Sequence, residues 1–263
     1  MGEAPVAKKS LGQHWLTDPT SLQAMVDAAR VQSTDTVLEI GPGLGSLTEV
    51  LVQVADKVVA VEFDAALAKD LPSRVASNDL SVVISDILSF DFTKMPAIYK
   101  VVANIPYYLT SNLIRVISET PNQPTMAVLL VQKEVAERVV AKPGAMSLLS
   151  VTAQFYWQTS LGIKVPAALF SPPPKVDSQI LILERRSALL FPDLDPKSFF
   201  RLVKAGFSQR RKTLLNSLSA GLHLTKSETQ ALLNTAGIDA RLRPQNLSLE
   251  AWQAIYTATV NNK

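Results

Sequence analysis

The stretch Val37-Leu38-Glu39-Ile40-Gly41-Pro42-Gly43-Leu44-Gly45-Ser46-Leu47 decides the fold class of this chain. The apolar run Thr36–Ile40 predicts a strand, the glycines that follow predict a tight turn, and the spacing of Ser46–Val54 predicts a helix. Glycines in such a turn remove the Cβ atoms that would keep a ligand away from the backbone. The stretch therefore predicts a ligand-binding turn between a strand and a helix.

The spacing of the glycines separates two classes of nucleotide ligand. A dinucleotide-binding turn has the spacing G-x-G-x-x-G, whereas the third glycine here, Gly45, comes one position early. Glu39 would repel a pyrophosphate, but it suits a ligand that carries an ammonium and a sulfonium group. The pattern resembles the first motif of the class I S-adenosylmethionine-dependent methyltransferases, with Gly41 and Gly43 against the cofactor. The alternative is a chance glycine-rich turn.

Further apolar runs predict more strands of the same sheet. Between the first two of them lies a segment with helical spacing, Ala65–Leu71. Strands that alternate with helices imply βαβ units and a parallel sheet, so we expect an α/β fold. The expected strands of this sheet after the first are Lys57–Val61, Ser81–Ile84, Tyr99–Ala103 and Met126–Val131. A separate strand-like run, Gln179–Glu184, comes before the helical C-terminal region.

Acidic residues follow two of these strands at the places where such a cofactor needs them. Glu62 ends the strand Lys57–Val61, and a carboxylate there can accept hydrogen bonds from both ribose hydroxyls. Asp86 follows the next strand and is expected to accept from the adenine amino group, with Phe63 and Ile87 on either side of the ring. Either acid alone is more often a loop-surface residue. Their joint placement favours a cofactor site.

The segment Asn104-Ile105-Pro106-Tyr107 predicts the chemistry, because it follows a strand at the edge where open α/β sheets bind ligands. The exocyclic nitrogen of adenine is a poor nucleophile, since its lone pair is conjugated with the ring. The side-chain oxygen of Asn104 and the carbonyl of Ile105 can accept its two hydrogens and release that lone pair. Pro106 fixes the turn, and Tyr107 offers a face to a base removed from its stack. Attack on a sulfonium methyl then needs positioning rather than a strong base. The alternative is an Asn-Pro turn beside core aromatics.

Composition excludes several classes of protein. The 263 residues are 47% hydrophobic and 19% charged, which is typical of globular proteins and excludes disorder for most of the chain. The absence of cysteine excludes a disulfide scaffold, thiolate metal sites and thiol catalysis, and we expect no metal. No apolar stretch has the length of a membrane span, and residues 1–20 lack a signal-peptide core. We expect a soluble, cytoplasmic, monomeric protein without a membrane partner.

Charge divides the chain into two parts. Residues 187–263 contain ten basic and five acidic residues, a net charge of +5, which leaves −2 for residues 1–186. Such a basic, helical region indicates a polyanion partner, the alternative being an ordinary solvated helix face. We therefore expect a catalytic domain at residues 1–190 and a helical RNA-binding domain at residues 191–263. Its expected helices, the last two with serine N-caps, are Pro196–Phe207, Arg211–Ser219, Ser227–Ala236 and Ser248–Thr259.

Taken together, these motifs identify a family. The chain resembles the KsgA-type ribosomal RNA adenine-N6,N6-dimethyltransferases along nearly its whole length. The resemblance implies a Rossmann-like class I methyltransferase sheet with a small C-terminal all-helical domain. It also implies dimethylation, with S-adenosylmethionine, of two adjacent adenosines near the 3′ end of 16S rRNA in the small subunit or its precursor. The matching stretches are Lys9–Leu16, Glu39–Gly45, Asn104–Tyr107, Val131–Ala136, Phe170–Ser178 and Phe207–Leu214.

The resemblance also implies roles for residues outside the sheet edge. Residues 13–16 would close over the cofactor, with His14 and Leu16 touching it, and Phe170 would pack on the target adenine opposite Tyr107. The cluster Arg210-Arg211-Lys212 would contact RNA phosphates. One departure stands out, because the family pattern Asn-Phe is replaced here by His14-Trp15. A neutral histidine keeps one hydrogen bond, but it can change the pH dependence of binding.

Other functions remain open from the sequence. Within the family, the alternative is the 23S rRNA adenine-N6 methyltransferase of the macrolide-resistance type, and the full basic tail favours the small-subunit enzyme. A protein-glutamine or DNA-adenine methyltransferase would have proline where Ile105 stands. A non-enzymatic ribosome-assembly or transcription factor with a vestigial cofactor fold is disfavoured by the intact motif residues.

Overall fold

The structure is a computed structural model that describes residues 12–261. Lys9, Ser10 and Leu11 of the first matching stretch lie outside these residues. The strands are β1 (Trp15–Leu16), β2 (Thr36–Ile40), β3 (Lys57–Glu62), β4 (Leu80–Ile84), β5 (Lys100–Asn104), β6 (Met126–Gln132), β7 (Trp157–Val165), β8 (Phe170–Ser171) and β9 (Ser178–Arg185).

Helices separate most of these strands. The α-helices are α1 (Pro19–Ala28), α2 (Ser46–Leu51), α3 (Ala65–Arg74), α4 (Thr110–Glu119), α5 (Lys133–Val139), α6 (Leu148–Tyr156), α7 (Pro196–Phe207), α8 (Leu214–Leu222), α9 (Lys226–Thr235) and α10 (Leu249–Asn261). Short 3₁₀ turns are η2 (Ile87–Ser89), η3 (Phe92–Lys94), η4 (Tyr107–Leu109), η5 (Ala167–Leu169) and η6 (Pro244–Asn246). No helix among residues 12–261 has the length and apolar character required to cross a bilayer.

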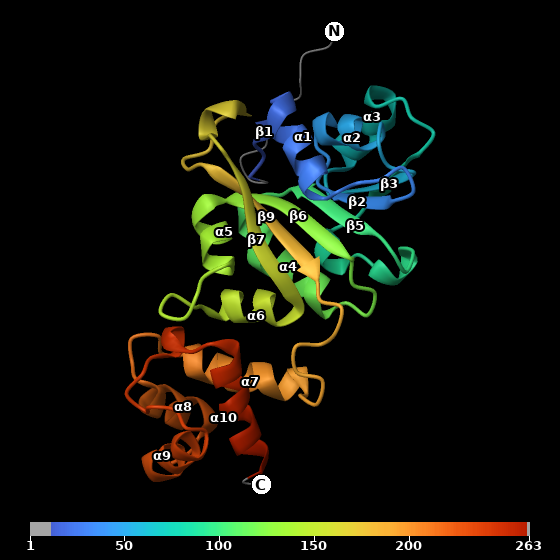
Figure 1. Cartoon of the computed structure of the whole chain (residues 1–263). Helices are drawn as coiled ribbons and strands as arrows, with labels where there is room; N and C mark the ends of the chain where they lie inside the picture. The colour runs from blue at the N-terminus through green and yellow to red at the C-terminus, as the bar shows by residue number, and fades with distance from the viewer. Residues whose placement is uncertain (1–11, 262–263) are drawn as a thin grey trace. The chain divides into compact units, whose positions relative to one another are not determined.

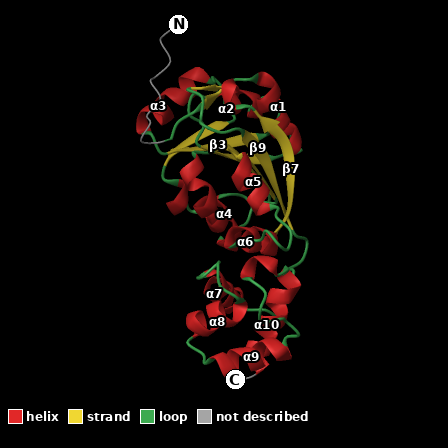
Figure 2. Cartoon of the chain, turned by 90° about the vertical axis from the view of Figure 1, so that its left-hand side faces the viewer, coloured by secondary structure: helices red, strands yellow, loops and turns green. Residues whose placement is uncertain are grey.

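The chain forms two compact units. The first contains the residues up to Ala136 together with Trp157–Arg185, and the second contains Glu137–Tyr156 and the residues from Arg186 onward. The second unit thus contains α6 and α7–α10, whereas the sequence-based division placed residues 1–190 together. In the first unit, α1, α2 and α3 lie on one side of the sheet and α4 on the other (Figure 2). This is the expected α/β class I methyltransferase fold, and the expected C-terminal helices are present.

The main sheet has seven strands in the order β4-β3-β2-β5-β6-β9-β7 (Figure 1). The first five run parallel, as expected. From β2, the chain adds β3 and then β4 on one side of this strand, and β5 and β6 are then added on its other side. The topology therefore reverses between β2 and β5, which is where open α/β sheets bind ligands.

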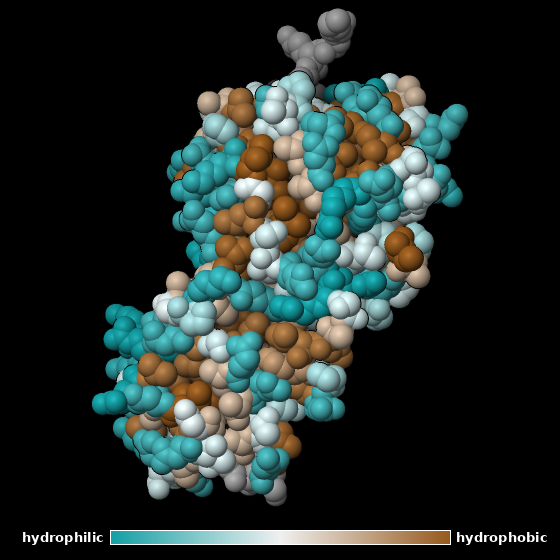
Figure 3. Space-filling view, in the orientation of Figure 1, coloured by the Kyte–Doolittle hydropathy of each residue, from teal (hydrophilic) through white to brown (hydrophobic). Residues whose placement is uncertain are grey.

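The last two strands extend the predicted parallel sheet with antiparallel strands. β9 runs antiparallel to β6, and β7 runs antiparallel to β9. β7 was not predicted at all, because it follows α6 without a turn residue and an irregularity at Leu161/Lys164 breaks its alternation. It is an edge strand, and hydrophobic side chains reach the surface near it (Figure 3), with Ile163 47% exposed.

Of the four helices expected in this region, α7 has the expected bounds, and the ends of α8, α9 and α10 differ from the sequence-based bounds by one to three residues. α8 begins at Leu214, three residues later than predicted, so that Arg211 precedes the helix. A basic cluster in the first turn would oppose the helix dipole. α9 is capped by Thr225 with Glu228 in a capping box, not by the predicted serine. For α10 the expected serine is correct, since Ser248 Oγ accepts from the N–H of Ala251 at 3.2 Å.

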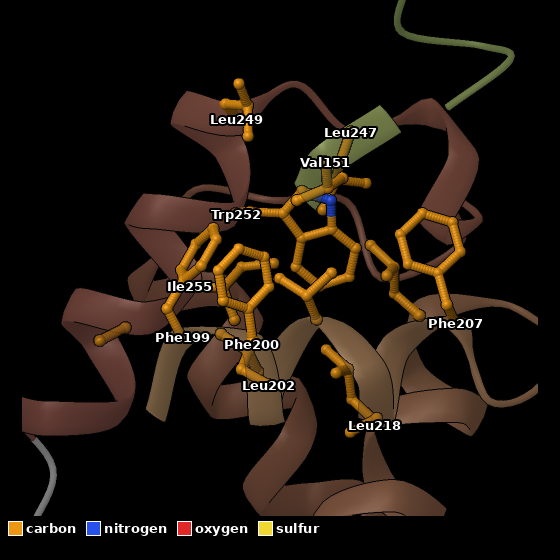
Figure 4. Packing of buried hydrophobic residues seen from close by; sticks show 14 of the residues in the cluster. Val151, Phe199, Phe200, Leu202, Phe207, Leu218, Leu247, Leu249, Trp252 and Ile255 are labelled. Carbon is orange, nitrogen blue, oxygen red and sulfur yellow. The ribbon is translucent and has the colours of Figure 1, made fainter. Parts of the chain in front are cut away.

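The second unit has its own hydrophobic core, which explains why a short helical region folds. Trp252 is fully buried and lies among Phe199, Phe200 and Phe207 (Figure 4). The indole packs so closely on α7 that a Cβ at Gly206 would lie 2.3 Å from its Cη2 atom. Only glycine fits at this helix crossing, so the core fixes α10 against α7.

His223 ends α8 in the left-handed conformation, with φ 58° and ψ 38°. This conformation costs a non-glycine residue about 1–2 kcal/mol. We expect His223→Gly to raise the free energy of unfolding by about 0.5–1 kcal/mol, measured by urea denaturation. His223→Ala is the control, because it removes the imidazole but keeps the unfavourable backbone. Equal effects of the two variants would show that backbone strain is not the cause.

Candidate active site

A cavity of about 270 Å³ opens in the first unit at the carboxyl ends of β2, β3 and β5. The structure brings to it every residue that the sequence predicted for the cofactor and the reaction. These lining residues are His14, Leu16, Gly41, Gly43, Glu62, Phe63, Asp86, Ile87, Asn104, Ile105, Pro106, Tyr107 and Phe170. The parallel strands explain this convergence, since their carboxyl ends share one edge.

The glycine turn forms the floor of this cavity. Gly41, Gly43 and Gly45 all have positive φ, at 67°, 56° and 92°, and Gly45 is the N-cap of α2. A Cβ on Gly43 would lie 2.5 Å from Cζ3 of Trp15. The indole therefore rests directly on bare backbone, which explains how a tryptophan is accommodated here. Trp15 lies within residues 13–16, which the resemblance places over the cofactor, but it was not predicted to touch the ligand; the structure shows that it lines the cavity.

Glu62 links the turn to the end of β3. Its carboxylate accepts hydrogen bonds from the N–H groups of Gly43 at 3.1 Å and Asp64 at 2.8 Å. Burial raises the pKa of Glu62, and these two hydrogen bonds act in the opposite direction. The carboxylate is thus fixed in place by the backbone at the cavity wall.

Two further residues lie at the neighbouring strand ends. Asp86 caps the turn η2 by accepting from the N–H of Leu88 at 2.9 Å. Ile87 is buried, whereas Phe63 is 63% exposed. Phe63 is thus a large aromatic residue that lines the cavity and still faces solvent. Both side chains line the cavity and offer it apolar surface, which suits contact with a flat aromatic ring.

Glu39 is the least solvated acid in the site. It is 1% exposed, lines the cavity, and its Oε2 atom has no hydrogen-bond partner among the described residues. Burial raises its pKa to about 8. The hydroxyl of Thr48 acts in the opposite direction, and the nearby carboxylate of Glu62 adds to the effect of burial. A buried carboxyl with one unpartnered oxygen favours a cationic ligand, because binding would supply the missing opposite charge.

Replacing Glu39 tests this account in the ligand-free protein. The pKa of the folded state, about 8, lies above the usual 4.5, so folding takes up a proton and stability falls as the pH rises between these values. We expect Glu39→Gln to be more stable than wild type at pH 8, and the difference in the free energy of unfolding to be much smaller at pH 5. This difference should grow with pH by at most about 1.4 kcal/mol per pH unit. Urea unfolding at both pH values measures this. The exposed Glu49→Gln is the control, and a pH-independent difference for Glu39→Gln would contradict the prediction.

Asn104 to Tyr107 form the edge of the cavity directly after β5. Asn104 is the last residue of β5, and Ile105 is 2% exposed. Pro106 is the N-cap of the turn η4, and its carbonyl accepts from the N–H of Leu109 at 3.0 Å. The ring of Tyr107 is part-buried, and burial raises the pKa of its hydroxyl. Two acceptors and an aromatic ring thus occupy four consecutive positions.

A two-stranded sheet holds the N-terminal segment over this region. β1 pairs antiparallel with β8, so that Leu16 lies opposite Phe170 and Trp15 opposite Ser171. His14 Nδ1 lies 2.7 Å from the carbonyl oxygen of Pro172. This pairing brings two stretches together that are more than 150 residues apart in sequence, and both line the cavity.

Arg210, Arg211 and Lys212 lie in the second unit, in the turn between α7 and α8, and do not line the cavity. All three are exposed, and the N–H of Lys212 donates to the carbonyl of Gln209 at 2.8 Å. The turn directs three cationic side chains to solvent within three positions. This favours a contact with an extended anion rather than a structural ion pair.

Comparison with known proteins identifies the family. A model of the ribosomal RNA adenine dimethylase family matches residues 5–259. The chain belongs to this family. The dimethylase is 42% identical over 260 residues to "Ribosomal RNA small subunit methyltransferase A" of Dehalococcoides mccartyi, covering 97% of this chain and 89% of the relative. It is 41% identical to the protein of the same name from Desulfitobacterium hafniense, covering 97% of this chain and 93% of the relative.

Solved structures agree with this assignment. A dimethyladenosine transferase from Plasmodium falciparum has a TM-score of 0.77 at 28% identity and covers 92% of the dimethylase and 96% of its own chain. The 23S rRNA methyltransferase ErmE has a TM-score of 0.72 at 27% identity, covering 93% and 98%. Members of the family are enzymes that use S-adenosylmethionine as methyl donor.

Proposed function

We propose that the dimethylase transfers methyl groups to N6 of two adjacent adenosines near the 3′ end of 16S rRNA, during maturation of the small ribosomal subunit in the cytoplasm. We also propose that it acts as a monomer. The observation that carries the proposal is the segment Asn104–Tyr107 at the cavity edge, in a chain 42% identical along 97% of its length to a small-subunit methyltransferase. Two adenosines with two methyl groups each require four transfers.

The cavity fits S-adenosylmethionine, which supplies an electrophilic methyl group and leaves as S-adenosylhomocysteine. Glu39 has a buried carboxyl oxygen without a partner, which suits the ammonium group of the methionine part. Gly41 leaves room for that part to approach the backbone, whereas the bare backbone of Gly43 is covered by Trp15. Glu62 is fixed where it can accept from the ribose hydroxyls. His14 and Leu16 would cover the ligand from β1 and the residue before it.

The adenine ring of the cofactor would lie between the side chains of Phe63 and Ile87, which both line the cavity. Asp86 then accepts from the adenine amino group with the carboxylate oxygen that does not cap η2. The exposed apolar surface of Phe63 would be removed from water when the adenine ring packs against it, and this burial would stabilise binding. These roles account for every lining residue that the sequence predicted on this side of the cavity.

At the target base, Asn104 and Ile105 orient the amino group. Their oxygen atoms accept its two hydrogens, which directs the nitrogen lone pair toward the methyl group. Bound S-adenosylmethionine would supply the methyl group to this lone pair and leave as S-adenosylhomocysteine, and the N6 proton would pass to solvent. No strong base is needed, because positioning and stabilisation of the developing charge carry the rate. Tyr107 and Phe170 would enclose the flipped base.

The cluster Arg210-Arg211-Lys212 would bind RNA phosphates. Such contacts position the enzyme on RNA without reading sequence, so the choice of adenosine depends on RNA shape and on bases that can be splayed out. The three side chains are exposed and none of them lines the cavity, which supports this division of roles.

The second candidate function is methylation of 23S rRNA, which the likeness to ErmE favours. The two candidates can be separated by tritium transfer from labelled S-adenosylmethionine. We expect label in undermethylated small subunits and not in naked 23S rRNA. Labelling of 23S rRNA alone would overturn the proposed function. Mass spectrometry of 16S rRNA from a deletion strain, which should lack dimethyladenosine, is an independent check.

A further inference from the structure

Tyr107 is held by a residue that no motif of the sequence analysis assigns to the reaction. Its hydroxyl lies 2.8 Å from Oγ of Ser178, and the two residues are 71 positions apart. Tyr107 belongs to a three-residue turn whose next residue, Tyr108, is 62% exposed. A tyrosine on such a turn has two free side-chain torsions unless its ring is anchored. The hydroxyl contact is therefore the anchor that the turn itself does not supply.

Ser178 is a rigid anchor. It is 0% exposed and is the first residue of β9, where it pairs with Gln132 of β6 and Val165 of β7. The residue before it, Asp177, accepts from the N–H of Lys133 at 3.0 Å through its carbonyl and from the N–H of Ala167 at 3.0 Å through its side chain. The position of the serine hydroxyl is thus fixed by the sheet, independently of η4.

The ring of Tyr107 has a second contact on its face. It stacks with the ring of His14 at a centroid distance of 5.9 Å and an interplanar angle of 22°. His14 is itself bound to the carbonyl oxygen of Pro172 at 2.7 Å. The hydroxyl contact and the ring contact come from different elements, so together they define both the place and the tilt of the ring.

We propose that Ser178 is a positioning residue that holds the ring of Tyr107 in the orientation in which it stacks on the target adenine. The inference rests on the proposed function, in which Tyr107 receives that base. Ser178 is buried and acts only through the tyrosine hydroxyl. A ring fixed before the base arrives need not be ordered during binding, which favours the reactive geometry.

The test is a double-mutant cycle with Ser178→Ala, Tyr107→Phe and the double variant. Each single variant deletes one half of the same hydrogen bond and keeps the aromatic ring. We expect each to lower the single-turnover rate on small-subunit RNA about three- to tenfold, the effect of losing one ordinary hydrogen bond. The KM for S-adenosylmethionine should not change. The double variant should be no slower than the slower single variant, because there is only one bond to lose.

A second readout reports stacking directly. RNA with 2-aminopurine at the target position loses fluorescence when the base stacks on an aromatic ring, whether or not methyl transfer occurs. We expect less quenching by Ser178→Ala and Tyr107→Phe than by wild type. The matched control is Ser118→Ala, another fully buried serine, whose hydroxyl accepts from Nε1 of Trp157 at 2.7 Å. It should lower the melting temperature without changing the rate or the quenching.

The outcomes separate this inference from the proposed function. If Ser178→Ala keeps the wild-type rate and quenching, or slows the Tyr107→Phe background as much as it slows wild type, Ser178 does not act through Tyr107. Tyr107→Phe leaves β9 untouched, so it tests the bond even if Ser178→Ala folds poorly. Failure of wild type to methylate small-subunit RNA would instead overturn the proposed function.

Discussion

Replacing Asn104 with alanine should lower the rate of methyl transfer by roughly a hundredfold or more while leaving binding to the small ribosomal subunit nearly unchanged. Asn104 ends β5 and lines the cavity, where its side-chain oxygen is one of the two acceptors proposed for the N6 hydrogens. Alanine keeps the strand but leaves the amino group with a single acceptor. The lone pair then remains conjugated with the ring, and the nitrogen remains a poor nucleophile. The readout is the single-turnover rate at saturating RNA and S-adenosylmethionine.

Asn104→Asp is the matched variant, since it has the same shape and keeps an acceptor oxygen at the same place. It should retain more activity than Asn104→Ala, and circular dichroism should show both variants folded. Filter binding of undermethylated small subunits should give similar affinities for all three proteins. Wild-type turnover by Asn104→Ala would show that the two-acceptor mechanism is wrong.

Much of the candidate site could be predicted from the sequence, because it rests on strand ends. The turn after β2, the acid that ends β3 and the segment after β5 are local patterns, and parallel strands bring their carboxyl ends to one edge. Recognising each strand and the residues that follow it was therefore enough to predict which side chains line the cavity. The net positive charge of the C-terminal region could also be predicted, because it follows from counting the charged residues in that part of the sequence.

The contacts that could not be predicted join residues far apart in sequence. The hydrogen bond between Tyr107 and Ser178 and the stacking of His14 on Tyr107 depend on where β9 and β1 lie. β9 enters the sheet antiparallel beside β7, a strand whose irregular alternation hid it. Without that strand, nothing in the sequence indicates that Ser178 faces η4. Glu39 could be identified as unusual for a phosphate site, but its complete burial depends on packing.

Replacing Arg210, Arg211 and Lys212 together by alanine should lower the affinity for small-subunit RNA about a hundredfold at 0.1 M salt. Each phosphate contact releases counterions and contributes about 0.7–0.9 to the slope of log affinity against log salt. Three lost contacts reduce that slope by about 2–3, which corresponds to roughly two orders of magnitude at this salt concentration. The measurement is RNA binding between 50 and 200 mM salt.

The control removes the same charge from the other unit. Lys57, Lys69 and Lys94 are exposed in the first unit, and their triple alanine variant changes the net charge by the same amount. If the basic turn between α7 and α8 contacts phosphates, only its own variant should flatten the salt dependence strongly. Methyl transfer at saturating RNA should then recover toward the wild-type rate in that variant, since none of its three residues lines the cavity. An equal loss of affinity in both triple variants would mean that net charge, and not this turn, attracts the RNA.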